Sequence, residues 1–344
     1  MENTSEAPAP LEEEDTTIRA IDLGMFFIAL SLALFILAAN LSTILAIWLT
    51  PGLRTMANSY VCSLACADLV VGAVCVLLAI YLLPPFRVGW FDKYEVMCSL
   101  LNGLNIGMTV VSAFSMTLIA VDRYIYITKP YFYQRKINFR VIGVSVTSVW
   151  LAGLVVAFLP QFIATYHPQC HITGRLPVWY LFYLCTFCYI LTCAVNIALY
   201  SIILQVAHKQ RKAVVAIRAS VQTPEPGDGS RANSRGPKQI ISKGSMKSIK
   251  FFLTVFGCFF CCITPMVLIL ALDIYVPVPA PIYRLFNVLA LINSAMNFLI
   301  YAGMNAQFRR AIVRTSPLCR GCAWIFCHSR MKNSGVEVET TTAW

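Results

Sequence analysis

The chain has 344 residues, of which 58% are hydrophobic and 12% are charged, and its 27 Lys and Arg against 16 Asp and Glu give a formal net charge of +11. A soluble globular protein carries about twice that charged fraction, so the composition excludes this class and indicates that most of the chain lies in a membrane. Seven uncharged runs, one of them interrupted only by Asp68, can each hold a helical span of about 20 residues. They cover residues 23–53, 55–86, 96–121, 141–174, 176–208, 251–272 and 285–308. We therefore predict an all-α membrane protein with a seven-transmembrane helix bundle, because strands of a membrane barrel would be about 10 residues long and alternating.

The distribution of basic residues predicts the orientation of the bundle. With the N-terminus outside, 22 Lys and Arg lie on the internal side and only 5 on the external side. The positive-inside rule then gives an extracellular N-terminus and a cytoplasmic C-terminus, in a multi-pass protein of the plasma membrane. The positive net charge follows from this topology and does not indicate nucleic-acid binding.

Residues 1–22 are acidic and polar, and they are predicted to be an extracellular disordered segment. They lack the basic start and apolar core of a cleavable signal peptide. Asn3-Thr4-Ser5 is a glycosylation sequon on the external side, which makes Asn3 a candidate acceptor. The helical domain is expected to cover residues 23–304.

The third span begins at Cys98 and ends at an adjacent acid and base, Asp122 and Arg123, which Tyr124 follows. No charged side chain occurs in the 26 residues before Asp122. On this tripeptide alone a solvated helix end is the simpler interpretation. Charges at a membrane border are nevertheless costly unless they are satisfied, so a functional pair is the other interpretation, and the landmarks of the other helices favour it.

Two of the 14 cysteines, Cys98 and Cys170, fall in or beside the proposed external loops. The outside is the oxidising side of the membrane, and we predict that these two form a disulfide. The cysteines within the spans are expected to be small packing residues.

Basic segments follow the fifth and the seventh spans. Residues 209–245 contain Gly, Ser and Pro and are predicted to be a cytoplasmic linker after the fifth span. Pro265 is expected to kink the sixth helix. Residues 305–344 form a cytoplasmic tail that begins with a short amphipathic helix, in which Phe308 and Ile312 oppose three arginines.

Each predicted span carries one landmark. In chain order they are Asn40, Leu64-Ala65-Cys66-Ala67-Asp68, Asp122-Arg123-Tyr124, Trp150, Tyr200, Phe259 with Pro265, and Asn297 with Tyr301. Together they resemble a rhodopsin-like (class A) G-protein-coupled receptor over nearly the whole chain. Residues 63–72 and 119–130 are most similar to the biogenic-amine branch, adrenergic receptors especially. The resemblance implies a seven-helix receptor with a helix 8 and heterotrimeric G proteins as partners.

The resemblance implies a polar pocket within the membrane around Asp68. The residues that match the oxygen ligands of the family's sodium site are Asp68, Ser112, Asn293, Ser294 and Asn297. A hard cation prefers such oxygens, and a buried carboxylate requires a cation, a proton or hydrogen-bond donors. Sodium would be an allosteric ligand, and no cofactor or other metal is expected. A water-filled polar network without an ion is the alternative.

The resemblance also implies a switch at the internal end. In the family, Asp122 restrains Arg123 at rest, and Arg123 enters the G-protein crevice once the sixth helix has moved. The switch residues are Asp122, Arg123, Tyr124, Tyr200 and Tyr301. Many relatives carry an acid at the base of the sixth helix, whereas residues 243–247 include two lysines and no acid. We expect a weakened resting state with basal activity; the alternative is that the missing acid has no effect.

The ligand pocket departs from the amine receptors that the chain resembles. Those receptors carry an aspartate on the third helix, and Asn105 stands at the matching position. An amide cannot neutralise an ammonium group, so we predict a neutral pocket that hydrogen-bonds its ligand. The predicted pocket residues are Asn102, Asn105, Met108, Thr109, Tyr189, Ile263, Met266 and Asn287. The alternative is that the asparagines only join helices. Leu291 at the place of the opsin lysine excludes a retinal Schiff base.

Three further departures fall in the activation machinery of the family. Ile263 stands where relatives have a tryptophan, and Thr192 and Phe298 replace the prolines of the fifth and seventh helices. Without these prolines the backbone hydrogen bonds are restored and the helices straighten. Conventional coupling is thereby put in question.

The tail carries candidates for modification and for partners. Zinc would need four ligands and only His328 accompanies the three tail cysteines. Palmitoylation is therefore the better interpretation of Cys319, Cys322 and Cys327. Phosphorylation of residues 340–342 would add charge for arrestin. A PDZ-type groove could capture the carboxylate of Trp344.

No nucleophile–base pair or metal set falls in a plausible cleft, so the chain is predicted not to be an enzyme. The predicted function is that of a receptor that binds an extracellular small molecule or lipid and transmits the signal to G proteins. One alternative is a ligand-independent or non-signalling receptor-like partner protein, and another is a biogenic amine receptor with an atypical pocket. A third is a seven-helix channel or transporter, against which the lack of an internal repeat argues.

Overall fold

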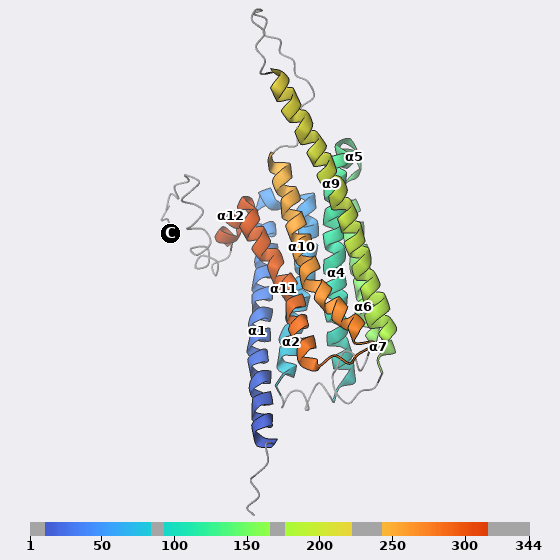
Figure 1. The fold of residues 1–344 in the computed structure, drawn as a ribbon. Helices are drawn as coiled ribbons and strands as arrows, with labels where there is room; N and C mark the ends of the chain where they lie inside the picture. The colour runs from blue at the N-terminus through green and yellow to red at the C-terminus, as the bar shows by residue number, and fades with distance from the viewer. Residues whose placement is uncertain (1–10, 84–92, 166–175, 222–242, 316–344) are drawn as a thin grey trace, which may run out of the picture.

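The computed structural model describes residues 11–83, 93–165, 176–221 and 243–315, and every regular element in these ranges is a helix (Figure 1). The long helices are α1 (Leu11–Leu49), α2 (Met56–Tyr81), α4 (Glu95–Thr128), α6 (Phe139–Phe158), α9 (Cys185–Val221), α10 (Lys243–Leu272) and α11 (Ala280–Met304). The short ones are η1 (Pro51–Leu53), α5 (Pro130–Lys136), α7 (Pro160–Ile163), the π-helix η3 (Trp179–Leu184) and α12 (Ala306–Thr315). Seven helices are long and apolar enough to cross a membrane, which confirms the predicted seven-helix fold.

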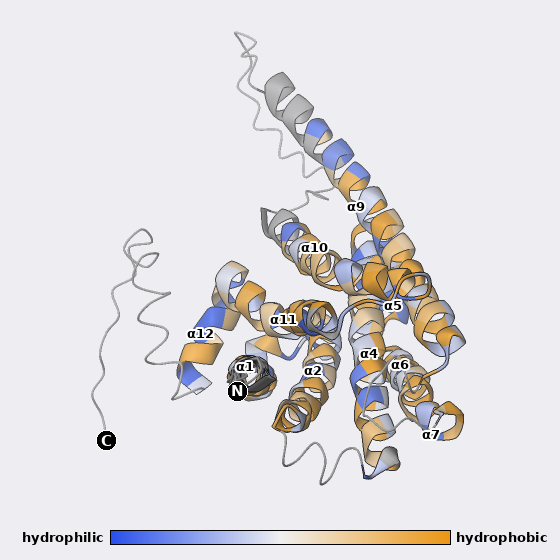
Figure 2. Cartoon of the chain, turned by 60° about the horizontal axis from the view of Figure 1, so that its bottom comes forward, coloured by the Kyte–Doolittle hydropathy of each residue, from blue (hydrophilic) through white to orange (hydrophobic). Residues whose placement is uncertain are grey.

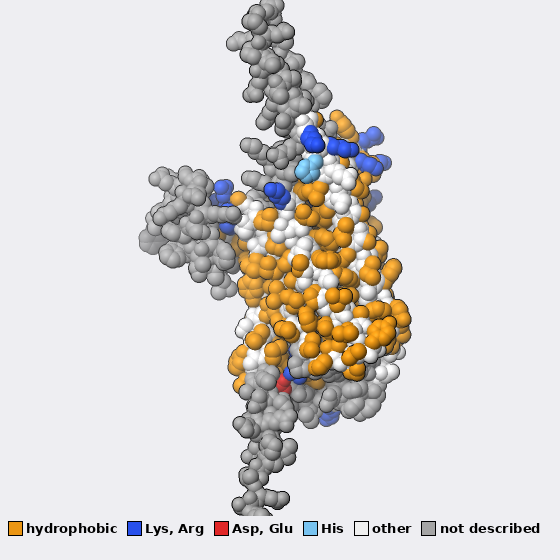
Figure 3. All heavy atoms as spheres, viewed as in Figure 1, with side chains coloured by type: hydrophobic (Ala, Val, Ile, Leu, Met, Phe, Trp, Pro, Cys, Tyr) orange, Lys and Arg blue, Asp and Glu red, His pale blue; other side chains and the backbone are white. Residues whose placement is uncertain are grey.

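Hydrophobic side chains cover the middle of the bundle, and basic side chains gather at one end of it (Figure 3). The exposed basic residues at that end include Lys129 and Arg135 beside α4, Lys212 on α9, and Arg310 on α12. Near the opposite end, the Asp22 carboxylate on α1 pairs with the Arg284 guanidinium on α11. This pattern of an apolar belt with an asymmetric charge distribution is typical of a membrane bundle.

Two segment boundaries differ from the sequence-based expectation. α1 begins at Leu11, inside the segment 1–22 that was expected to be disordered. α9 continues to Val221 and α10 begins at Lys243, so both helices extend into the expected linker 209–245. Residues 209–221 contain no Gly or Pro, and nothing in their composition ends the helix.

α4 is the central helix of the bundle and contacts α2, α6, α9 and α10. Figure 2 shows it between α2 and α6 in a view toward one end of the molecule. Glycines allow its backbone to approach α6. A methyl group added at Gly103 would lie 2.1 Å from the Ala157 carbonyl oxygen, and one added at Gly153 would lie 2.1 Å from Val111. Small residues at membrane helix contacts allow such close backbone packing.

The amphipathic helix predicted after the last span is confirmed. Asn305 begins it, because its Oδ1 accepts hydrogen bonds from the backbone N–H groups of Gln307 (3.0 Å) and Phe308 (3.2 Å). Phe308 and Ile312 are buried against the bundle. The Gln307 side chain donates to the Gly52 carbonyl oxygen at 3.1 Å, which links α12 to the turn between α1 and α2.

Candidate functional site

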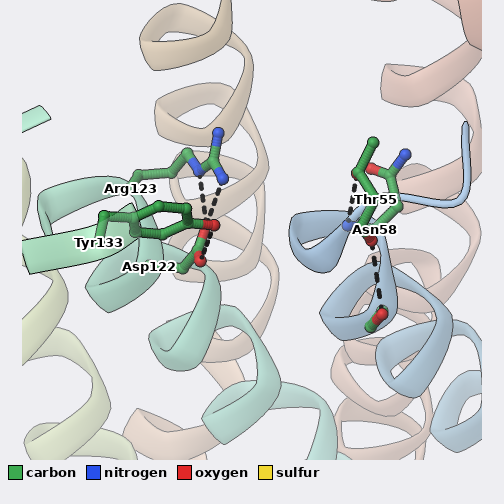
Figure 4. Close-up of polar contacts among 6 residues, drawn as sticks. Thr55, Asn58, Asp122, Arg123 and Tyr133 are labelled. Atoms are coloured by element: carbon green, nitrogen blue, oxygen red, sulfur yellow. Dashed lines mark hydrogen bonds and ion pairs between the residues drawn. The ribbon is translucent and has the colours of Figure 1, made fainter. Parts of the chain in front are cut away.

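One end of α4 carries the Asp122–Arg123 pair (Figure 4). The Arg123 Nε donates to Asp122 Oδ2 at 2.9 Å, and the Nη2 atom donates to the same oxygen. The Tyr133 hydroxyl donates to the other oxygen, Asp122 Oδ1, at 2.9 Å. The guanidinium also lies over two rings, 5.1 Å from the centroid of Tyr126 and 5.8 Å from that of Phe252. Both carboxylate oxygens are therefore paired, and the arginine is held along its own helix.

Tyr133 was missed by the sequence analysis. It lies eleven residues after Asp122, on α5, which begins at Pro130 and folds back beside the end of α4. Burial, followed by the negative charge of the Asp122 carboxylate, raises the pKa of Tyr133 to about 12. The phenol therefore keeps its proton at neutral pH and remains a hydrogen-bond donor. No residue pattern marks this contact, because it depends on the direction that the chain takes after α4.

Two of the other predicted switch residues, Tyr200 and Tyr301, are buried and contact aromatic rings, whereas Tyr124 is half-buried. The Tyr200 ring lies 6.0 Å from Phe256, and the Tyr301 ring lies 5.2 Å from Phe251. Tyr124 packs against the same core cluster, which joins the described parts of α4, α9, α10 and α11. The side chains of residues 243–248, where the family's acid would be sought, lie outside the described residues. The pair is thus in the restrained arrangement that the resemblance implies for the resting state.

A second polar site surrounds Asp68, whose side chain is fully buried in α2. Its Oδ1 accepts from the hydroxyls of Ser112 on α4 (3.3 Å) and Ser294 on α11 (2.8 Å). Its Oδ2 accepts from the Asn297 amide at 2.8 Å. Asn40 on α1 donates to the Ser294 carbonyl oxygen at 3.1 Å. Four helices are therefore joined around one carboxylate, and four of the five predicted sodium ligands lie together.

A cavity of about 30 Å³ adjoins this network. Its lining residues are Val71, Asn105, Thr109, Ser112, Asn287, Ala290, Leu291, Asn293 and Ser294, and all of them are neutral. Such a volume holds about two water molecules or one small ion. The Oδ1 atoms of Asn105 and Asn293 are buried without a hydrogen-bond donor. Asn293, the fifth predicted sodium ligand, thus lines the cavity and is not among the three residues that donate to the Asp68 carboxylate.

The cavity joins two sets of residues that the sequence analysis kept apart. Asn105, Thr109 and Asn287 come from the predicted ligand pocket, whereas Ser112, Asn293 and Ser294 come from the predicted sodium site. Asn105, Thr109 and Ser112 follow one another at helical spacing along α4, so one face of that helix serves both. The Thr109 hydroxyl is satisfied within α4, by the Asn105 backbone carbonyl at 2.8 Å.

The remaining predicted pocket residues lie elsewhere. Met108 is 1% exposed in a core cluster with residues of α1, α2 and α11, because it points about 100° around the helix from Thr109. The Asn102 amide donates to the Cys98 carbonyl oxygen at 3.1 Å. The Tyr189 hydroxyl pairs with Thr264, and Ile263 is buried in the core cluster that contains Phe259. Met266 is half-buried on α10. Met108 does not line this cavity, and all five residues stay predictions as ligand contacts.

Several predicted modification sites are tested only in part or lie beyond the described ranges. Cys98 is buried and disulfide-bonded, but Cys170 lies outside the described residues, so their pairing stays a prediction. Also outside are the glycosylation candidate Asn3, the palmitoylation candidates Cys319, Cys322 and Cys327, and the C-terminal residues 340–344.

A further polar contact that the sequence analysis missed joins α4 to α9. The Asn196 amide donates to the Thr117 hydroxyl at 2.8 Å and to the Thr192 carbonyl oxygen at 2.8 Å. Both Asn196 and Thr192 are buried. Neither the Asn196 Oδ1 nor the Thr192 hydroxyl has a hydrogen-bond partner among the described residues. Asn196 and Thr117 are polar residues within uncharged spans, and that was the signal that could have suggested this contact.

Seven spans, a buried carboxylate network and an acid–arginine pair define a seven-helix receptor. The sequence model described as "7 transmembrane receptor (rhodopsin family)" matches residues 39–301, and the chain belongs to this family. It is 25% identical to octopamine receptor beta-2R of Drosophila melanogaster, over 91% of the chain and 64% of that receptor, so it spans less than two thirds of this relative. It is 24% identical to the D(1) dopamine receptor of Carassius auratus (93% and 95% covered) and 28% identical to melatonin receptor type 1B-B of Danio rerio (80% and 76% covered). These relatives are receptors and not enzymes.

Proposed function

We propose that the chain is a cell-surface receptor that binds a neutral, hydrogen-bonding ligand and signals to heterotrimeric G proteins. The observation that carries this proposal is the placement of both sites on α4. Asn105 lies at the neutral cavity near one end, and Asp122 and Arg123 lie at the other end. A ligand that orders the Asn105 end acts on the same helix that holds the restrained arginine.

The cavity itself holds only about two water molecules, so it supports a neutral ligand through the chemistry of the residues around it and not through its volume. No lining residue carries a charge, and the nearest carboxylate, Asp68, already accepts three hydrogen bonds. A ligand ammonium buried beside Asn105 would have no counter-ion, which is costly. The Asn105 Oδ1 accepts no hydrogen bond and suits an N–H or O–H donor of a ligand. Relatives are named for octopamine, dopamine and melatonin, and melatonin is an amide without an ammonium group.

Sodium fits the Asp68 network as an allosteric ligand. The Asp68 carboxylate, the Ser112 and Ser294 hydroxyls and the unpaired Asn293 Oδ1 are oxygen donors around or beside a cavity large enough for one small ion. These residues would hold the ion, which would neutralise the buried carboxylate. A bound cation would join α2, α4 and α11 and thereby favour the resting arrangement.

The orientation and the output follow from charge. The end that carries Asp122 is also the basic end of the bundle, which the positive-inside rule places in the cytoplasm (Figure 3). G-protein coupling at this end requires release of Arg123 from Asp122. The restraint consists of contacts with Asp122 and two rings, and basal activity is expected because the base of α10 supplies two lysines and no acid in residues 243–247.

A second candidate function is that of a receptor-like partner without its own signal. It is favoured by the uninterrupted α9 and α11, in which Thr192 and Phe298 replace the family's prolines. The two candidates differ in whether Arg123 matters. Arg123→Ala is expected to abolish any second-messenger response of the first candidate and to leave the second unchanged.

The decisive experiment restores a carboxylate in the cavity. Asn105→Asp is expected to create a response to biogenic amines that the wild-type receptor lacks, because the new charge pairs with the ammonium group. The measurement is a second-messenger screen over amines and neutral amides or lipids. Asn102→Asp, one turn away on the same helix, is the matched control and should create no such response. An equal amine response of the wild type would contradict the neutral pocket.

A further inference from the structure

One hydrogen bond joins the side chains of α9 and α10. The Tyr189 hydroxyl lies 2.5 Å from Thr264 Oγ1, and both side chains are half-buried. Thr264 also donates to the Phe260 carbonyl oxygen, one turn earlier on α10, at 2.5 Å. Because a threonine hydroxyl has a single hydrogen, Tyr189 is the donor in the contact between the helices. Within the described residues, no other side-chain hydrogen bond joins α9 to α10.

This contact lies at a turn of α10 that a proline weakens. Pro265 follows Thr264 directly inside the helix. Because proline has no backbone N–H, the Cys261 carbonyl oxygen loses its usual partner, and helices bend most readily at such a turn. Ile263 is aliphatic and cannot form a hydrogen bond with its side chain. The hydroxyl of Thr264 is therefore the group through which α9 fixes the rotation of α10 about its own axis.

The buried face of α10 leads from this turn to Arg123. Side chains that are each at most 8% exposed recur on it at spacings of three or four residues: Phe252, Phe256, Phe259 and Ile263. The ring of Phe252, at the far end of this face, lies 5.8 Å from the Arg123 guanidinium. A rotation of α10 moves the whole face, so it also changes the contact between Phe252 and Arg123.

Ring contacts with α9 follow the same face of α10. The Tyr189 ring lies 6.1 Å from the Phe259 ring, and the Tyr200 ring lies 6.0 Å from the Phe256 ring. Phe256 and Phe259 stack on each other at 6.4 Å. Packing of these four rings keeps α9 and α10 together. The Tyr189 hydroxyl adds a directional contact to this packing, at the end of the row that is farther from Arg123.

We propose that the hydrogen bond from Tyr189 to Thr264 holds α10 in the resting position and thereby sets the level of basal signalling. Both are positioning residues, which act on Arg123 through Phe252. The proposal rests on the receptor function proposed above, in which Arg123 is released on activation. Residues 243–247 supply no acid to hold the base of α10, so a restraint on this helix has to come from elsewhere along it. Loss of the hydrogen bond allows α10 to rotate at Pro265 and carries Phe252 away from the guanidinium.

The test measures the position of α10 in the full receptor in nanodiscs, without ligand or G protein. Genetically encoded spin labels at two exposed positions, Arg140 on α6 and Lys250 on α10, report the distance between the basic ends of these helices. Tyr189→Phe keeps the ring, and Thr264→Val keeps the shape of the side chain. Each should shift the distance distribution to longer values. Thr264→Ser, which restores the hydroxyl, should return the distribution of the wild type.

Two substitutions serve as matched controls. Thr254→Val on α10 also removes a hydroxyl that donates within the helix, to the Lys250 carbonyl oxygen at 2.8 Å, and it should leave the distance distribution unchanged. Tyr183→Phe, on the 66% exposed tyrosine of η3, should do the same. Basal second-messenger accumulation should rise about fivefold in Tyr189→Phe and in Thr264→Val, the ratio that corresponds to one ordinary hydrogen bond. The double variant should rise no further, because both changes remove the same bond.

The outcomes separate this restraint from the proposed function. An unchanged distance distribution in Tyr189→Phe would overturn the proposal, and so would an equal shift in Thr254→Val. A shift in Tyr189→Phe that is absent from Thr264→Val would also overturn it, because the effect would then belong to the tyrosine and not to the bond. A shift in both variants without any second-messenger response would uphold the restraint and contradict the proposed coupling to G proteins.

Discussion

The two ends of α4 satisfy their polar groups in different ways. At the Asp122 end, both carboxylate oxygens accept hydrogen bonds from within the chain, from Arg123 and from Tyr133. At the Asn105 end, the Oδ1 atoms of Asn105 and Asn293 are buried beside a cavity and accept none. An unpaired buried polar atom costs about 1–3 kcal/mol, so the second end is incomplete without a further molecule. The comparison shows that one end satisfies its polar groups within the chain, whereas the other leaves two acceptors for water, an ion or the proposed ligand.

The largest effect is expected from breaking the helix contact that both ends share. Gly153→Leu forces a side chain against Val111 and should destabilise the receptor by about 3 kcal/mol, because the backbones of α4 and α6 are too close to accommodate it. Thermal unfolding in detergent and the amount of protein at the cell surface measure this loss. Gly143→Leu on the same helix is the control, since nothing lies within 4 Å of an added Cβ there. Equal stability of the two variants would contradict the close contact.

The restraint at the Asp122 end is tested by removing one donor. Tyr133→Phe deletes the hydrogen bond to Asp122 Oδ1 and keeps the ring that packs edge-on against Tyr126. A hydrogen bond to a charged group contributes about 2 kcal/mol, so basal signalling should rise by up to about thirtyfold. Second-messenger accumulation without ligand is the readout. Tyr131→Phe, on the same short helix but 80% exposed, should have no effect; a similar rise in both variants would exclude a specific restraint.

The Asp68 network is tested by the effect of sodium on the stability of the ligand-free receptor. The melting temperature of the ligand-free receptor should be higher in sodium chloride than in choline chloride, by the equivalent of about 1 kcal/mol at a few times the dissociation constant. Asp68→Asn should abolish this difference, because the amide cannot neutralise the cation. Asp22→Asn, which removes an acid that pairs with Arg284 outside the cavity, should preserve it. A sodium effect that persists in Asp68→Asn would favour the water-filled network.

The smallest effect on stability is expected at Asn105, where a substitution can remove ligand binding without weakening the fold. Asn105→Leu removes an unpaired buried oxygen. It should leave the free energy of unfolding unchanged or raise it by up to about 1 kcal/mol, and it should abolish the ligand response. Asn297→Leu removes a hydrogen bond to Asp68 Oδ2 and should lower the free energy of unfolding. The two substitutions are the same chemical change on facing helices. A loss of stability in Asn105→Leu would show that this asparagine joins helices.

The sequence predicted well what depends on local composition or on helical spacing. Uncharged runs gave the seven spans, and the adjacent positions of Asp122 and Arg123 made their pairing predictable. Spacing also placed Asn105 and Thr109 on one face. It failed where the partner comes from a change of chain direction, as for Tyr133.

The boundary between the two predicted sites of the cavity was also beyond sequence reasoning. Asn105 and Ser112 belong to different motifs, and only the fold shows that one cavity, lined by residues of α2, α4 and α11, touches both. Polar composition predicts irregular structure in segments 1–22 and 209–245, but α1 already begins at Leu11 and α9 continues to Val221. Charged residues without Gly or Pro are compatible with a helix.

The glycine contact between α4 and α6 has a mechanical consequence. The close approach of α4 and α6 at Gly103, Gly107 and Gly153 leaves no room for larger side chains, so we expect these two helices to move together. Any motion that carries a signal must then occur against this pair, in the helices that meet it through side chains. α10 is such a helix, since its Phe252 ring lies against the Arg123 guanidinium. In the proposed function, Arg123 would lose this contact with α10 when the receptor is activated.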